Sequence, residues 1–195
     1  MRNCLACVGV ASLAAAVALA QGPEPSRGTA SVTLEGKTIS VDYGRPSVQG
    51  RTVEALLQKL PADRMWRAGA NEVTTFATEM DLMLGNTRVP AGKYSMYVHC
   101  PETGEYSLTL NKALGQPLGS IWKEAPAELK DKPYPHFKYT EQIGDQEVAR
   151  VPMKRIATTQ PADLFTVQLE RSEEGALMTL WWGDQGWAIP LRLAK

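Results

Sequence analysis

The chain has 195 residues, of which 44% are hydrophobic and 22% charged, with 16 glycines and 13 prolines. This composition is that of an ordinary globular protein, and it excludes a collagen, a coiled coil, a wholly disordered chain and a polytopic membrane protein. Lysine plus arginine and aspartate plus glutamate both number 21, so the net charge is zero and bulk charge gives no indication of nucleic-acid binding.

The first twenty residues have the layout of a secretory signal peptide. A short basic start at residues 1–3 precedes an uncharged apolar run that extends to Ala20. The run ends in Ala-Leu-Ala, the small-x-small pattern that a signal peptidase accepts. It is short and rich in alanine for a retained membrane anchor. We therefore expect residues 1–20 to be removed and the exported chain to be periplasmic or extracellular, with no membrane span.

Cleavage at this point would leave Cys100 as the one cysteine of the mature chain, because Cys4 and Cys7 lie in the removed segment. No intramolecular disulfide could then form, and the hydrophobic core alone would hold the domain together. We expect Cys100 to be a buried apolar side chain rather than a nucleophile.

The mature sequence predicts short strands joined by tight turns. After a lead-in rich in Gly and Pro at 21–30, which we expect to be flexible, apolar and polar residues alternate from Ser31 onward. The dipeptide Glu35-Gly36 suits a two-residue hairpin turn, and this turn places Val32 opposite Ile39 on one face.

One helix is predicted over residues 52–60. Thr52 can cap its start and Pro61 follows its end. The apolar residues recur at the helical spacing i, i+3, i+4 and i+7, namely Val53, Leu56, Leu57 and Leu60.

The remainder of the chain predicts more strands and one long interruption. Residues 113–147 contain four prolines and several charges, and we expect them to form an extended surface loop excursion with one helical turn near 127–130. We expect this loop to be packed by its aromatic residues Trp122, Tyr134, Phe137 and Tyr139. The other predicted strands are 73–78, 81–84, 94–100, 106–111, 148–157, 164–171, 176–182 and 187–193.

These elements predict an all-β fold over residues 31–195, in a single domain. Nine or ten short strands with hairpin connections favour an antiparallel two-sheet β-sandwich of jelly-roll type, with one short helix. A closed β-barrel is the alternative.

The motifs of common catalytic and metal sites are absent from the sequence. It contains no G-x-S-x-G elbow, no P-loop and no G-x-G-x-x-G. His99 and Cys100 are neighbours on a predicted strand, so their side chains point to opposite faces and cannot hold one metal ion. We predict no metal site and no cofactor, and we assign no catalytic residue.

Two segments that flank the predicted helix, 42–51 and 65–72, carry side chains typical of a ligand site. If the helix folds back, both segments lie at the same end of the sandwich. Arginine binds carboxylate or phosphate through two parallel hydrogen bonds, and an aromatic face can stack on a ring. We predict a non-enzymatic pocket for a small polar or anionic ligand or an envelope partner. Its candidate residues are Tyr43, Arg45, Arg51, Trp66, Arg67 and Asn71.

The same two segments also support interpretations without such a pocket. Asp42 and Glu72 could pair with these arginines, and the arginines would then be purely structural. A cell-envelope hydrolase that acts on glycans is a second possibility, because it needs only two suitably spaced carboxylates. A structural or assembly protein with no ligand is a third. The oligomeric state is not predicted.

Three motifs of this chain resemble the signature of a bacterial family of exported proteins, the domain-of-unknown-function family 2911. They are Val-Asp-Tyr-Gly-Arg-Pro-Ser-Val-x-Gly-Arg at 41–51, Trp-Arg-x-Gly-Ala-Asn-Glu at 66–72 and Val-Pro-Ala-Gly-Lys-Tyr-Ser-Met-Tyr at 89–97. The similarity extends from about Ser31 to Leu193. The resemblance implies an exported, largely β protein, and it brings no activity, substrate or catalytic residue.

Overall fold

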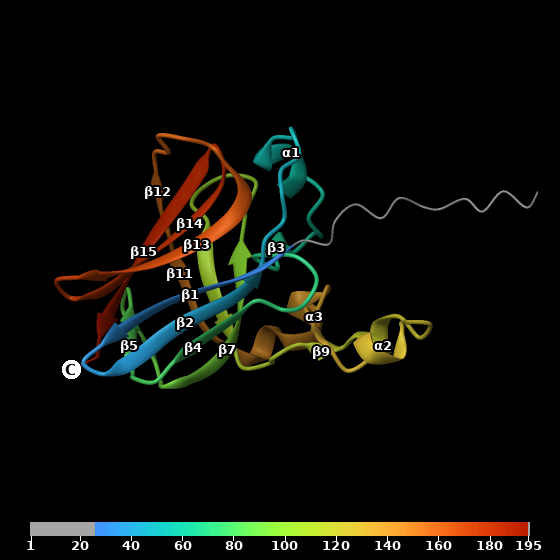
Figure 1. Cartoon of the computed structure of the whole chain (residues 1–195), viewed down its shortest axis with the longest axis horizontal. Coiled ribbons are helices and arrows are strands. Elements are labelled where there is room, and N and C mark those ends of the chain that lie inside the picture. Colours follow the sequence, from blue (N-terminus) through green and yellow to red (C-terminus); the bar gives the residue numbers. More distant parts are fainter. Residues whose placement is uncertain (1–25, 195) are drawn as a thin grey trace, which may run out of the picture.

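Most of the strands form two large antiparallel sheets that pack on one another through a shared core, and residues 116–117 and 133–134 form a separate two-stranded pair (Figure 1). The structure is a computed structural model, and it describes residues 26–194. The predicted signal peptide at 1–20 lies outside the described residues, as does half of the predicted lead-in. Within the described part of the chain, no helix is long and apolar enough to cross a membrane.

The first sheet has seven strands in the order β1-β2-β4-β7-β8-β11, with β3 paired to β7. A two-residue turn joins β1 to β2 and residues 100–106 join β7 to β8, whereas the other paired strands are separated by longer stretches of chain that contain further elements. The strands are β1 (Arg27–Leu34), β2 (Lys37–Gly44), β3 (Met65–Trp66), β4 (Thr75–Thr78), β7 (Gly92–His99), β8 (Ser107–Asn111) and β11 (Glu147–Pro152).

The second sheet has six strands in the order β13-β14-β15-β5-β6, with β12 paired to β15. Its long strands come from the C-terminal third of the chain, coloured orange to red in Figure 1. The strands are β5 (Leu82–Leu84), β6 (Thr87–Val89), β12 (Lys154–Ile156), β13 (Ala162–Ser172), β14 (Gly175–Gly183) and β15 (Gln185–Leu193).

This arrangement confirms the predicted antiparallel two-sheet sandwich. The described strands divide into separate sheets, and they do not form the closed barrel that the sequence left as the alternative. The predicted hairpin register is also confirmed, since Val32 pairs with Ile39. The first strand begins at Arg27, so residues 27–30 pair with β2 instead of belonging to a flexible lead-in.

The core lies between the sheets and receives apolar side chains from both. Ile39 and Phe76 of the first sheet and Leu180 and Leu191 of the second are fully buried. Burial of one such side chain contributes about 1.5–3 kcal/mol to folding. Cys100 is fully buried as well, as the sequence predicted, and it is not in a disulfide.

The predicted helix is present but short, as α1 (Val53–Leu57). Thr52 caps it, because its hydroxyl accepts a hydrogen bond from the Ala55 N–H at 3.2 Å. Val53 and Leu57 are buried, so the predicted apolar stripe faces the sandwich.

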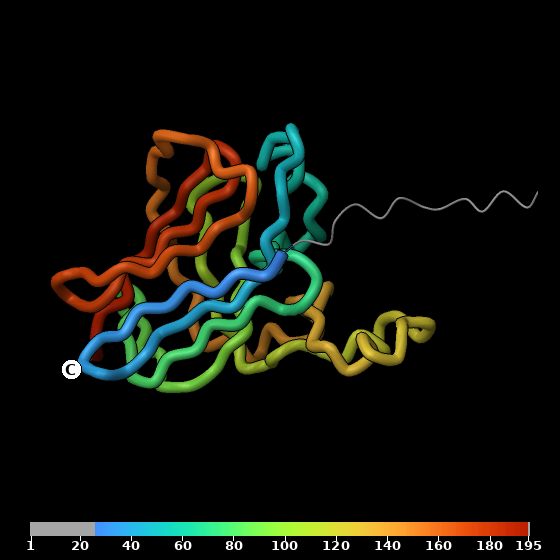
Figure 2. The backbone as a smooth tube through the Cα atoms, viewed as in Figure 1, coloured from blue at the N-terminus to red at the C-terminus, as the bar shows by residue number. Residues whose placement is uncertain are grey.

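Residues 113–147 form an arm that leaves the end of the sandwich where α1 also lies (Figures 1 and 2). The predicted turn near 127–130 is present. Tyr139 is fully buried, but Trp122 and Phe137 are exposed, which contradicts the prediction that they pack the loop. About half of each of these two side chains is open to solvent, 49% for Trp122 and 45% for Phe137. Its elements are β9 (Gln116–Pro117), α2 (Leu118–Ile121), η1 (Ala127–Leu129), β10 (Pro133–Tyr134), α3 (Tyr139–Ile143) and η2 (Gly144–Gln146).

Candidate functional site

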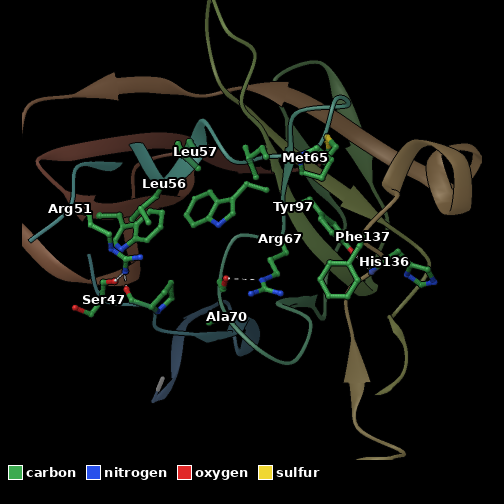
Figure 3. Close-up of a pocket in the computed structure, with 16 residues that line it drawn as sticks. Ser47, Arg51, Leu56, Leu57, Met65, Arg67, Ala70, Tyr97, His136 and Phe137 are labelled. Atoms are coloured by element: carbon green, nitrogen blue, oxygen red, sulfur yellow. Dashed lines mark hydrogen bonds between the residues drawn. The ribbon is translucent and has the colours of Figure 1, made fainter. Parts of the chain in front are cut away.

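A cleft of about 360 Å³ opens at the end of the sandwich that carries α1 and the arm (Figure 3). This volume falls at the lower end of the range of small-molecule sites, about 300–1,000 Å³. The lining comes from the loop after β2, from α1, from the segment that contains β3, and from β7, β14 and the arm. Both segments that the sequence singled out therefore contribute to one cavity.

The backbones of these two segments touch, and a glycine makes the contact possible. A Cβ atom added to Gly44 would lie 2.0 Å from the carbonyl oxygen of Ala70, far inside contact distance. Any larger residue at this position would force the segments apart. The meeting of the loops at one end, expected from the sequence, thus depends on the end of β2 lying directly against Ala70.

Arg67 is the cationic residue held most deeply in this cleft. Its Nε donates to the carbonyl of Gly69 at 3.4 Å, and its guanidinium lies 5.7 Å from the centre of the Phe137 ring. Burial lowers the pKa of Arg67 from its ordinary value, but arginine stays protonated in proteins. Within residues 26–194 its terminal nitrogens make no hydrogen bond and it forms no ion pair.

Arg51 lies on the opposite side of the cleft from Arg67, beside Ser47 (Figure 3). Its Nε donates to the carbonyl of Val48 at 2.9 Å, and its Nη2 donates to the carbonyl of Ser47 at 3.3 Å. Arg51 is exposed, and these bonds hold the turn of its own loop. Arg51 therefore borders the cleft, but two of its guanidinium nitrogens bind backbone carbonyls of its own loop.

Tyr43 and Arg45, also predicted for the pocket, do not line it. The Tyr43 hydroxyl donates to the carbonyl of Val167 at 3.3 Å. Arg45 donates to the carbonyl of Phe165 at 3.4 Å and to the hydroxyl of Thr166 at 3.2 Å. Because β13 crosses close to the end of β2, these two side chains join the sheets rather than face the cavity.

Asn71 and the two acids have structural positions. Asn71 has a φ of +57°, a left-handed conformation that asparagine tolerates, and it does not line the cleft. Asp42 pairs with Arg27, while Glu72 lies 3.7 Å from Arg27 and 3.2 Å from Lys132. In the described part of the chain neither acid pairs with Arg45, Arg51 or Arg67, so the interpretation in which they neutralise these arginines does not hold.

One wall of the cleft is aromatic and preorganised. Trp66, which the sequence predicted for the site, stacks on Trp182 with ring centres 5.0 Å apart and an interplanar angle of 6°. The Trp182 Nε1 donates to the carbonyl of Pro46 at 3.0 Å, which fixes the orientation of that indole. Trp66 also meets the edge of Phe165 at 4.9 Å. The wall is therefore in place before any ligand arrives.

Tyr97 and two residues of the arm, His136 and Phe137, line the cleft without having been predicted. The Tyr97 hydroxyl accepts a hydrogen bond from the His136 N–H at 3.0 Å, and burial raises the pKa of Tyr97 to about 12. Burial lowers the pKa of His136, whose Nδ1 is buried without a partner among the described residues. In Figure 3 the His136 ring lies beyond Phe137 as seen from Arg67. No sequence pattern could have found these residues, because only the path of the arm brings them here.

The cleft has none of the features of a metal centre. No group of three or more His, Cys, Asp or Glu side chains in residues 26–194 is arranged to hold an ion. None of the sixteen residues that line the cleft is an acid.

Comparison with known proteins gives a family but no activity. The model of a family described as a protein of unknown function (DUF2911) matches residues 25–191. No curated protein and no solved structure matches the chain.

Proposed function

Because the chain belongs to the DUF2911 family, which is described only as of unknown function, we propose its role from its own geometry: it is an exported, non-enzymatic domain that binds a small anionic ligand in the cleft beside Arg67. Export rests on the uncharged apolar run and the Ala-Leu-Ala pattern within residues 1–20.

The observation that carries the proposal is the state of the Arg67 guanidinium. It is half-buried in the cleft wall and has no acid partner within residues 26–194. Removal of a charge from water without a counter-ion is costly, so such an arrangement is favoured where an external anion completes the pair. The apolar walls around Arg67 would exclude water and strengthen that pairing.

The other two functions that the sequence left open have less support. A glycoside hydrolase needs two carboxyl groups on either side of the substrate, and the lining of this cleft supplies none. An assembly role would rest on the exposed apolar side chains of the arm, such as Trp122 and Phe137, and it gives no account of the cleft or of Arg67.

A thermal-shift screen of the purified chain against carboxylates, phosphates, sugars, nucleotides and divalent ions tests the proposal. A ligand at 100 times its dissociation constant should stabilise the fold by about 2.7 kcal/mol, or about 5–10 °C for a domain of this size. We expect anions to produce this shift, and Arg67→Met to abolish it.

The matched control is Arg45→Met. Arg45 comes from the other predicted segment, is also half-buried, and likewise has no acid partner among the described residues, but its bonds go to β13. This variant should have a lower melting temperature and keep the full ligand-induced shift. If no anion stabilises the wild type, or if Arg67→Met responds as the wild type does, the proposed function is wrong.

A further inference from the structure

Building on the proposed function, we infer that the ligand is an apolar monocarboxylate, a single carboxylate group attached to a compact hydrocarbon or aromatic body. Four features of the cleft lead to this class: its single half-buried cation, the free atoms of Arg67, the chemistry of its remaining surface and its size.

The first feature is that only one of the two arginines that line the cleft, Arg67, is half-buried, and it has no acid partner within residues 26–194. Arg51 is exposed and uses Nε and Nη2 on the carbonyls of Val48 and Ser47. His136 is neutral near pH 7 because burial lowers its pKa, and its ring lies beyond Phe137 (Figure 3). A phosphate monoester, with nearly two negative charges, would be only half neutralised by Arg67 alone. One cation therefore matches one carboxylate.

The second feature is the set of hydrogen-bond donors that remain. The bond from the Arg67 Nε to Gly69 fixes the plane of the guanidinium and leaves Nη1 and Nη2 unpaired in the described chain. Two terminal nitrogens of arginine can bind the two oxygens of a carboxylate through parallel hydrogen bonds. Tyr97 lines the cleft too, and its hydroxyl accepts from the His136 N–H, so its own proton is left to donate. Both residues thus offer donors, which an anion requires.

The third feature is that the surface away from Arg67 is mostly hydrocarbon and aromatic ring. Ser47 and Arg51 are its polar members, and the rest includes Leu56, Leu57, Leu60 and Met65 together with the stacked pair Trp66 and Trp182. A sugar or another polyol would place hydroxyl groups against these side chains, where few partners could replace their water. An apolar body, in contrast, gains from burial there.

The fourth feature is size. A volume of about 360 Å³ is near the smallest that ligand sites have, so it suits one ring or a short branched chain better than a nucleotide or a disaccharide. Phenylacetate and 4-methylpentanoate meet all four requirements, and they serve as probes.

The test is isothermal titration calorimetry of the full chain with compounds that separate head group from body. Phenylacetate and 4-methylpentanoate should bind. Phenylacetamide, which has the same body without the charge, should bind at least tenfold more weakly. Acetate, which has the head group without the body, and glucuronate, which has a carboxylate on a polar body, should also bind at least tenfold more weakly. Phenyl phosphate should bind no better than phenylacetate.

Two variants assign each part of the ligand to its part of the cleft. Arg67→Met should weaken the binding of phenylacetate at least tenfold. It should leave the affinity for phenylacetamide within about twofold of the wild-type value, since the amide makes no use of the charge. Leu60→Gln, on the half-buried apolar wall, should weaken phenylacetate more than acetate. Arg45→Met should change neither affinity.

The possible results distinguish this inference from the function on which it rests. If phenyl phosphate or glucuronate binds more tightly than phenylacetate and depends on Arg67, the site is an anion site and the ligand class is wrong. If phenylacetamide binds as tightly as phenylacetate, the charge of Arg67 is not used and the inference fails. If none of these compounds binds, and no other anion stabilises the protein, both proposals fail together.

Discussion

Asn111 joins the arm to the sandwich, and its replacement offers a quantitative test of how the cleft wall is held. The side chain is fully buried at the end of β8. Its Nδ2 donates to the Tyr139 hydroxyl at 3.0 Å and to the Ile143 carbonyl at 2.7 Å. Its Oδ1 accepts from the Ala113 N–H at 2.9 Å. The Tyr139 hydroxyl in turn donates to Glu147 at 3.0 Å. A single amide therefore fixes both the start of the arm and α3.

Asn111→Ala should lower the free energy of unfolding by about 3 kcal/mol. The Ile143 carbonyl belongs to a buried residue, and to leave such a group unpaired costs about 1–3 kcal/mol. Ala113 is half-buried, so its N–H can turn to water, and that lost bond costs about 0.5–1.5 kcal/mol. Loss of the bond from Asn111 to the Tyr139 hydroxyl adds little to this cost, because that hydroxyl keeps its own bond to Glu147. For a domain of this size, 3 kcal/mol lowers the melting temperature by about 6–12 °C.

Thr109→Val is the matched control, and it should not lower the free energy of unfolding. Thr109 lies two positions earlier on β8 and is equally buried, but its hydroxyl has no hydrogen-bond partner among the described residues. Removal of an unpaired buried hydroxyl should leave stability unchanged or raise it by about 1 kcal/mol. Urea unfolding followed by tryptophan fluorescence measures both variants. Equal losses in the two would show that packing on β8, and not the hydrogen bonds of Asn111, holds the arm.

Two further predictions follow from buried titratable groups. Burial raises the pKa of the Cys100 thiol to about 12, so iodoacetamide at pH 8 should label the Cys100 peptide only after unfolding in urea; labelling of the folded protein, read by mass spectrometry, would contradict this. Burial also lowers the pKa of His99 and His136. Below pH 6.5 the unfolded chain therefore binds more protons than the folded one, and the free energy of unfolding should fall as the pH drops from 7 toward the lowered pKa values. The double variant with glutamine at both positions should show a smaller fall over this range, and an identical pH profile would refute the assignment.

Some parts of this fold follow from neighbouring residues alone, and the sequence was enough to predict them. The alternation in the first two strands and the turn residues Glu35-Gly36 place Val32 opposite Ile39, because a two-residue turn allows one register. Thr52 caps α1 because its hydroxyl needs only the N–H groups of the next turn. The sandwich follows from many such strands, each with one apolar face that needs cover.

Short strands were missed where pairing depends on distant partners. From the sequence, residues 85–92 are expected only to connect two strands, yet Thr87–Val89 pair with β5 as strand β6. The two-residue strand β3 forms because β7 offers Val98 and His99 as partners. Such segments have too few residues for a periodic pattern.

The sequence by itself determined the sandwich, its first hairpin and the two polar segments that flank the helix, since these depend on local spacing and turn chemistry. Only the tertiary structure decided which arginine faces the cavity. Arg45 and Arg67 stand in similar motifs, but β13, about 120 residues along the chain from Arg45, supplies the carbonyl and hydroxyl groups that bind its guanidinium. Arg67 meets instead the ring of Phe137, brought in by the arm. Side-chain partners are set by contacts between segments far apart in the sequence, and spacing within one segment does not encode them.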